Sequence, residues 1–138
     1  MINFRLGEYE PEESASEKST SDIEKTYNVV DGSKAGDDKI IDHFKQVISN
    51  NYDPRKTLRQ KFYGGITNDI PSNLSRHGIE RYLACIKVES AERAARIEQR
   101  LHDDLQIYIG KTATGGRGKA DDSKYIYIAD RSLPGFQD

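Results

Sequence analysis

Residues 61–77, KFYGGITNDIPSNLSRH, constrain the fold most strongly because they join a strand directly to a helix. Residues 62–66 have the composition of a strand. Its glycine pair predicts a bend or a place where the backbone approaches a neighbour closely. Asp69 as a cap, Pro71 in the first turn and Gly78 as a stop predict a helix over 69–77. Such a junction can form a phosphate-handling site, and it can equally be an ordinary strand–turn–helix connection.

Apolar periodicity predicts the remaining elements. The expected helices are 37–50, 69–77 and 90–105, and the expected strands are 26–30, 62–66, 82–88, 106–109 and 125–129. Together they indicate an α+β domain with a small, mostly antiparallel sheet and helices packed on it. The tail that begins at Ser132 is expected to be frayed.

Composition divides the chain into an arm and one domain. Apolar residues make up 35% and charged residues 32% of the chain, and residues 8–25 are acidic and rich in serine. We therefore expect a disordered arm over 1–25 and a single domain over 26–138. No apolar run is long enough to span a membrane, and the start of the chain lacks the pattern of a secretory signal. The lone Cys85 lies in an apolar strand pattern, which predicts a small buried hydrophobe and a protein of the reducing cytoplasm.

The formal charge of −2 hides an asymmetry between the two parts of the chain. Residues 1–38 contain ten acids and four bases, whereas residues 39–138 contain thirteen acids and seventeen bases. Between Pro54 and Asn68 there are four bases and no acid, which suits contact with a polyanion, although a solvated face is the alternative. A glycine-rich loop further on carries Arg117 and Lys119, which could contact a phosphate or belong to a plain hairpin.

One carboxylate, Glu98, lies where an apolar side chain is expected. On a helical wheel of 90–105 it falls in the same sector as Ala94 and Leu101. An ionised carboxylate buried without compensation costs several kcal/mol. Glu98 is therefore expected to pair with a base, to lie at the rim of a pocket, or to bind a cation such as Mg²⁺.

The motif Tyr-Gly-Gly-Ile-Thr at 63–67 and the helix after it resemble the second signature of the GIY-YIG nuclease family, Tyr-Ile-Gly-x-Thr. The helix 90–105, with small residues before Glu98, is similar to the family's helix that carries a metal-binding glutamate. The resemblance covers about residues 62–105 and the closing strand. It implies a GIY-YIG-like fold in which Glu98 holds Mg²⁺ or Mn²⁺ and Tyr63 and His77 line the site. The family's arginine aligns with Asn73, so Arg76, one turn further along, is the candidate to replace it.

Two functions of different classes follow from these observations, and a plain nucleic-acid-binding module without turnover is a further alternative. The first is metal-dependent phosphodiester hydrolysis on DNA. Its predicted catalytic residues are Tyr63, Arg76, His77 and Glu98, and its predicted DNA contacts are Arg55, Lys56, Arg59, Lys61, Arg117 and Lys119. The second is a catalytically degenerate protein on the same fold, a phage or bacterial factor that engages nucleic acid, or a protein partner through its acidic arm. The loss of the family arginine, the loss of the first signature, Gly-Ile-Tyr, and the acidic arm favour this second function. Glu98 on an apolar helix face favours the nuclease, which is the preferred interpretation of the sequence.

Overall fold

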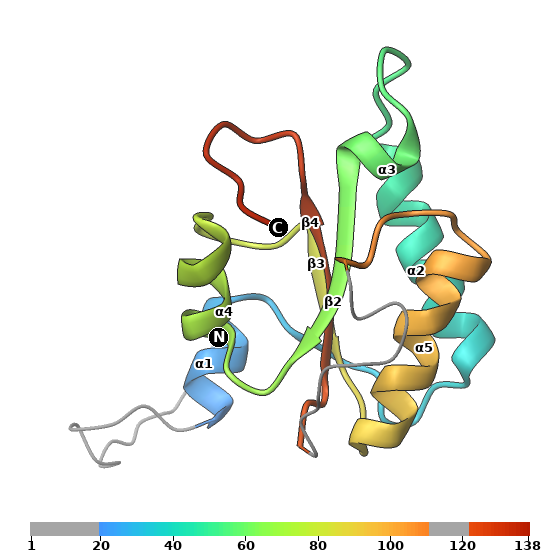
Figure 1. Ribbon diagram of the computed structural model, residues 1–138. Coiled ribbons are helices and arrows are strands. Elements are labelled where there is room, and N and C mark those ends of the chain that lie inside the picture. The colour runs from blue at the N-terminus through green and yellow to red at the C-terminus, as the bar shows by residue number, and fades with distance from the viewer. Residues whose placement is uncertain (1–19, 111–121) are drawn as a thin grey trace, which may run out of the picture.

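The computed structural model describes residues 20–110 and 122–138, which form three layers around a central sheet (Figure 1). The strands follow the spatial order β1-β3-β4-β2. Their bounds are Val30–Asp31 (β1), Phe62–Thr67 (β2), Ala84–Lys87 (β3) and Tyr125–Asp130 (β4). The helices are Thr20–Thr26 (α1), Asp37–Asn50 (α2), Leu58–Lys61 (α3), Ile70–His77 (α4) and Ala91–Asp103 (α5).

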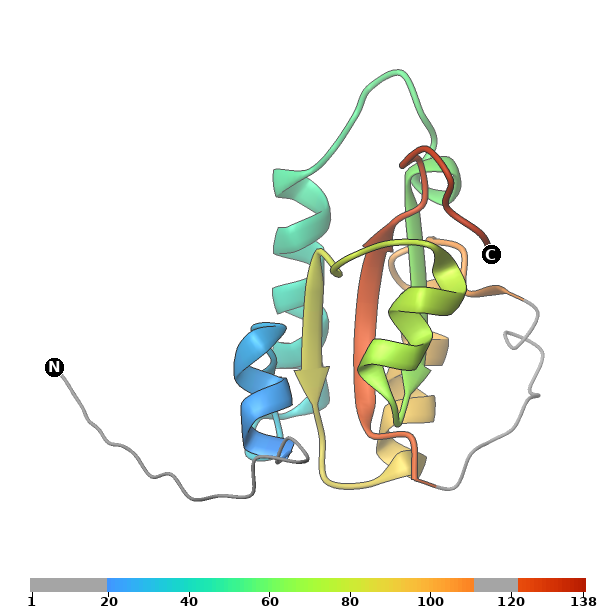
Figure 2. The same ribbon diagram turned by 90° about the vertical axis from the view of Figure 1, so that its left-hand side faces the viewer.

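Helices α2 and α5 cover one face of the sheet, and α1 and α4 cover the other (Figures 1 and 2). The described strands pair in mixed fashion, because β1 runs parallel to β3 while β4 runs antiparallel to both β3 and β2. The expected α+β class is therefore confirmed, with one parallel pairing at the edge.

The two faces differ in chemistry because side chains alternate along β4. Tyr125 and Tyr127 point to the face of α4, whereas Ile126 and Ile128 point to the face of α5. The α5 face is consequently an aliphatic core built on isoleucine and leucine. The α4 face gathers Tyr63, Tyr82, Tyr108, Tyr125, Tyr127 and Phe136.

The predicted helix signals are confirmed at α4 and α5. The Asp69 side chain accepts a hydrogen bond from the backbone N–H of Ser72, and Gly78 ends α4 at φ 74° in the left-handed region. At the start of α5, Ser90 accepts from the backbone N–H of Arg93. Both caps satisfy donors or acceptors that a helix end leaves without partners.

Three segments before β3 differ from the expectations. Helix α1 occupies the last part of the segment expected to be an arm, and Ile23 packs against the aromatic face. Glu24 holds α1 to the sheet by an ion pair with Lys87 and by accepting from the Tyr125 hydroxyl. The strand predicted over 26–30 is reduced to β1. The glycine pair lies in the middle of a continuous β2 and makes no bend.

The end of the chain is packed against the domain, so the expectation of a frayed tail is wrong. Phe136 contacts the aromatic face, and Arg131 forms an ion pair with Asp138. Of the strand predicted over 106–109, only a parallel bridge between Tyr108 and Tyr63 is present. Within the described ranges, no helix is long and apolar enough to cross a membrane.

Candidate functional site

The fold brings together two of the predicted catalytic residues, Tyr63 and His77. Tyr63 lies on β2 and His77 is the last residue of α4, and their ring centroids are 4.8 Å apart. Both side chains are nonetheless enclosed: Tyr63 is 8% exposed and His77 is 0% exposed. Their proximity was predictable from the strand–helix junction, but their enclosure was not.

Both ring nitrogens of His77 are occupied by protein groups. Nδ1 lies 2.6 Å from the carbonyl oxygen of Gln137, and Nε2 lies 2.8 Å from the hydroxyl of Tyr127. A carbonyl can only accept, so Nδ1 carries the hydrogen and donates to Gln137. Nε2 is then the acceptor, and the Tyr127 hydroxyl donates to it. His77 is thus a neutral imidazole with no free position for a ligand.

The same network continues through Asn73, the residue that aligns with the family's arginine. Asn73 is 6% exposed, and its Oδ1 accepts a hydrogen bond of 2.8 Å from the Tyr82 hydroxyl. Its side chain also forms a hydrogen bond with the Tyr127 hydroxyl, which works against the rise in the pKa of that phenol. Asn73 therefore connects buried tyrosines, and an arginine in its place would bring an uncompensated charge into this core.

Burial favours the neutral form of both candidate groups. Desolvation raises the pKa of Tyr63 and lowers the pKa of His77, so both are neutral at pH 7. The charge of Arg76 lowers both pKa values, but it is a smaller influence than burial on each. A general base must reach a substrate proton, and neither group is presented to solvent for this.

Glu98 belongs to α5, which packs on the opposite face of the sheet (Figure 1). It is 7% exposed, so the prediction that it lies on the buried face of its helix is confirmed. Its charge contributes to raising the pKa values of Tyr63 and Tyr127, which places it within electrostatic reach of both phenols.

Glu98 was predicted to hold a divalent metal ion. Among the described residues, no group of three or more His, Cys, Asp or Glu side chains is arranged to hold a metal ion. Mg²⁺ needs near-octahedral oxygen ligands, which one or two carboxylates supply together with water and phosphate. We derive no chemical step through a metal.

The glycine pair serves packing within the protein. A Cβ at Gly64 would lie 2.9 Å from Cδ1 of Leu101, and one at Gly65 would lie 2.5 Å from the Tyr127 hydroxyl oxygen. Tyr127 sits in register between Gly65 on β2 and Cys85 on β3. Two small residues, Gly65 and Cys85, therefore flank Tyr127. This lets its ring lie flat on the sheet, with its centroid 4.3 Å from the centroid of the Tyr82 ring. The close approach that was predicted at the glycine pair is therefore the approach of the Tyr127 side chain to Gly65, a contact within the protein.

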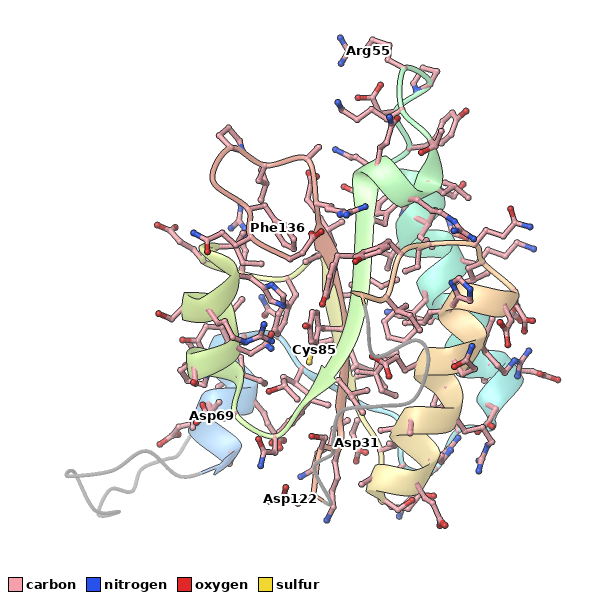
Figure 3. All side chains as sticks on the ribbon, viewed as in Figure 1. Asp31, Arg55, Asp69, Cys85, Asp122 and Phe136 are labelled. Carbon is pink, nitrogen blue, oxygen red and sulfur yellow. The ribbon has the colours of Figure 1, made fainter. Side chains whose placement is uncertain are left out.

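The predicted nucleic-acid contacts divide into exposed and paired residues. Arg55, Lys56 and Arg59 are exposed, and Figure 3 shows Arg55 at the tip of a loop that projects beyond the sheet. Lys61 is half-buried and forms a 2.9 Å ion pair with Asp130, so it anchors α3 to β4 instead. Arg117 and Lys119 lie outside the described residues.

Tyr52 is a surface residue that sequence reasoning did not assign to binding. It is 59% exposed and stands on the same loop as Arg55 and Lys56. We call residues 52–59 the basic projection. Its exposure could have been predicted from the polar run Asn-Asn-Tyr-Asp-Pro around it. Such a run favours a surface loop, and a tyrosine in that loop does not pack into the core.

The basic projection has a defined conformation. Asp53 accepts from the backbone N–H and the guanidinium of Arg55, and these hydrogen bonds lower the pKa of Asp53. Thr57 and Gln60 form a reciprocal capping box at the start of α3. These local bonds order the backbone of the loop, and Leu58 packs against the core, while the three cationic residues of the loop are exposed.

Comparisons of the chain with protein-family models, with curated proteins and with solved structures find no match. The resemblance to the GIY-YIG family therefore stays a prediction, carried by the residues quoted for it.

Proposed function

We propose that the protein is a non-catalytic binding domain that contacts the phosphate backbone of a nucleic acid through its basic projection. This is the second of the two functions expected from the sequence. The observation that carries this proposal is that Tyr63 and His77 are both buried and that both ring nitrogens of His77 have hydrogen-bond partners within the protein. Buried groups with internal partners stabilise a fold and do not meet a substrate. The nuclease activity and its metal ion stay predictions.

Exposed cations support the binding role. Lys56 and Arg59 form no ion pair with any described residue, and the Arg55–Asp53 pair is formed by an arginine side chain that is 86% exposed. Phosphate contacts by such residues release condensed counterions, and they supply most of the affinity of sequence-independent binding. Tyr52 adds an aromatic face on which an unpaired base can stack.

The salt dependence of binding follows from the number of phosphate contacts. With three contacts, from Arg55, Lys56 and Arg59, the affinity for duplex DNA falls about 40-fold between roughly 50 and 200 mM salt. For single strands the same contacts give a fall of about 20-fold. A surface that bound through apolar contacts would show little change over this range.

The test is fluorescence anisotropy with labelled single-stranded and duplex DNA. The double substitution Lys56→Glu with Arg59→Glu is expected to abolish binding at about 50 mM salt. The matched control, Lys34→Glu with Lys39→Glu, makes the same change of charge at two exposed lysines near the opposite end of α2. It is expected to retain most of the affinity. Equal loss in both variants would mean that only net charge matters, and it would refute the assignment of the surface.

A further inference from the structure

The Arg131 side chain, directly after β4, is held in one position by contacts with two other segments. The carbon of its guanidinium lies 3.8 Å from the centre of the Tyr108 ring, and its Nη1 donates to the Arg59 carbonyl at 2.8 Å. Its backbone N–H donates to the Lys61 carbonyl at 2.7 Å. These contacts fix the plane of the guanidinium and leave the edge formed by Nε and Nη2 for an anion.

Asp138 occupies this edge in the manner of a bound anion. Nε of Arg131 donates to Oδ1 at 2.9 Å and Nη2 donates to Oδ2 at 2.5 Å. An arginine forms the same bidentate geometry with a phosphate. Hydrogen bonding to Arg131 lowers the pKa of Asp138, so the carboxylate is charged at neutral pH. The Asp138 side chain is 43% exposed, so a ligand can reach the pair from solvent.

The residues that adjoin Arg131 favour an anion at this position. Asp130, the preceding residue, forms an ion pair of 2.9 Å with Lys61, so its charge is balanced within the protein. Arg59, whose carbonyl contacts Arg131, has an exposed side chain that forms no ion pair with any described residue. Without the Asp138 carboxylate, Arg131 would be a cation without a counter-ion next to the cations of the basic projection.

The segment before Asp138 is fixed by contacts of its own. The Phe136 ring stacks on the His77 ring with centroids 5.1 Å apart, and Figure 3 shows Phe136 pointing into the space between α4 and the sheet. The backbone N–H of Gln137 donates to the His77 carbonyl at 2.9 Å. The Asp138 carboxylate can therefore leave Arg131 while residues 136 and 137 stay in place. Because the carboxylate is tethered beside the guanidinium, its effective concentration there is high, and a displacing anion must bind more strongly than a carboxylate.

We propose that Arg131 anchors a binding site for a phosphate monoester, and that Asp138 fills this site as a built-in competitor until such a ligand displaces it. A phosphate monoester carries about −1.5 to −2 charge at pH 7 and offers three acceptor oxygens, so it competes better for the guanidinium edge than a carboxylate does. A phosphodiester lacks the second charge and this advantage. The terminal phosphate of a nucleic acid and a small phosphorylated molecule supply the same group. The site itself does not depend on the proposed function, whereas a nucleic-acid end as its ligand rests on that function.

Titration with inorganic phosphate tests the site directly. It is followed by NMR at the Nε–H of Arg131, which donates to Asp138 while the ion pair is formed, and sodium chloride at equal ionic strength is the reference. Asp138→Asn removes the competing charge and is expected to raise the affinity for phosphate by about fivefold, the factor that corresponds to an exposed ion pair of good geometry. In the unaltered chain the same signal is expected to shift at correspondingly higher phosphate concentrations.

Two variants provide the controls. Arg131→Gln added to Asp138→Asn is expected to abolish phosphate binding, measured at the backbone amide of Ser132. Asp104→Asn makes the same change of net charge at the ion pair with Arg100 on α5, and it is expected to leave the affinity for phosphate unchanged. An equal gain for Asp104→Asn, no gain for Asp138→Asn, or binding that persists in the double variant would overturn the proposal.

Two oligonucleotides, one with a terminal phosphate and one with a terminal hydroxyl, distinguish the sources of the phosphate. A nucleic-acid end as the ligand predicts that Asp138→Asn binds the phosphorylated strand more tightly than the other strand, and that adding Arg131→Gln removes the difference. Equal binding of both strands, together with the response to inorganic phosphate, would support the site and assign it to a small phosphorylated molecule. Phosphate binding without binding of either strand would refute the proposed function and leave this site standing.

Discussion

Gly65→Ala tests whether the glycine pair serves packing or a ligand. The added Cβ would lie 2.5 Å from the hydroxyl oxygen of Tyr127 and 2.7 Å from its Cζ. The ring has little freedom to move away, because it is 1% exposed, stacks on Tyr82 and donates to His77. Substitution must therefore displace the ring and break or distort the hydrogen bond to the imidazole.

The magnitude follows from three contributions. Overpacking of a close-packed core costs about 1–3 kcal/mol, and loss of the buried hydrogen bond costs about 1 kcal/mol more. Replacing glycine also lowers the conformational entropy of the unfolded chain, which stabilises the folded state by about 0.4–1 kcal/mol and offsets part of this loss. We expect the free energy of unfolding to fall by about 2–3 kcal/mol, measured by urea denaturation followed by far-ultraviolet circular dichroism.

Two other glycines provide the comparison. At Gly64 the nearest atoms are the ends of the flexible Leu101 and Ile107 side chains, so Gly64→Ala is expected to cost about 1 kcal/mol. At Gly36, the N-cap of α2, a Cβ would meet nothing within 4 Å. Gly36→Ala is the control, because the weaker cap and the lower entropy of the unfolded chain act in opposite directions and change stability by less than about 1 kcal/mol. Adding Tyr127→Phe to Gly65→Ala removes the closest atom and is expected to cost less than the sum of the two single changes. If Gly65→Ala is no more destabilising than Gly36→Ala, the packing explanation fails.

Two further predictions concern an ion-pair network and the cysteine. Hydrogen bonds from Arg96 and Arg93 hold the pKa of Asp37 at about 2, below its usual 3.8, so the stability it contributes is present above about pH 4 and is lost as pH falls toward 2. Asp37→Asn is expected to lower the free energy of unfolding at pH 7 by about 1–2 kcal/mol and to flatten its decline between pH 4 and 2; an unchanged acid profile would contradict this. Burial raises the pKa of Cys85 to about 12, and its side chain is 1% exposed. A thiol reagent is expected to modify it at least about a thousandfold more slowly than the unfolded chain, and rapid labelling of the native protein would show that the core opens there.

Local signals in the sequence predicted α2, α4 and α5 but neither α1 nor α3. Apolar periodicity over 37–50 indicated α2, and Asp69 with Gly78 indicated both ends of α4. These elements are specified by residues close together in the chain, so caps and periodicity are sufficient. The prediction that Glu98 lies on the buried face of its helix was also correct.

Tertiary contacts explain what the sequence did not reveal. Helix α1 was hidden because its short stretch has an acidic composition, and only its packing through Ile23 and its ion pair from Glu24 to Lys87 hold it to the sheet. Residues 132–138 were expected to be frayed because a Leu-Pro-Gly run has no secondary structure of its own. Their order comes from Phe136 and from His77, which is about 60 residues earlier in the chain.

The candidate site shows the same division. The junction at 61–77 correctly brought Tyr63 and His77 together, since strand and helix are consecutive. It could not show that Tyr127 and Gln137 form hydrogen bonds with the two ring nitrogens of His77, because these partners belong to β4 and to the segment 132–138. A motif therefore identified neighbours in space without revealing whether they are open to a ligand.

A single gel experiment on end-labelled DNA with Mn²⁺ tests the central claim most directly, because it reports both complex formation and cleavage. We predict a shifted band that disappears with Lys56→Glu and Arg59→Glu, and no cleavage product above that of a Glu98→Gln control. A Mn²⁺-dependent product that Glu98→Gln abolishes while the shifted band persists would contradict the account and establish the nuclease.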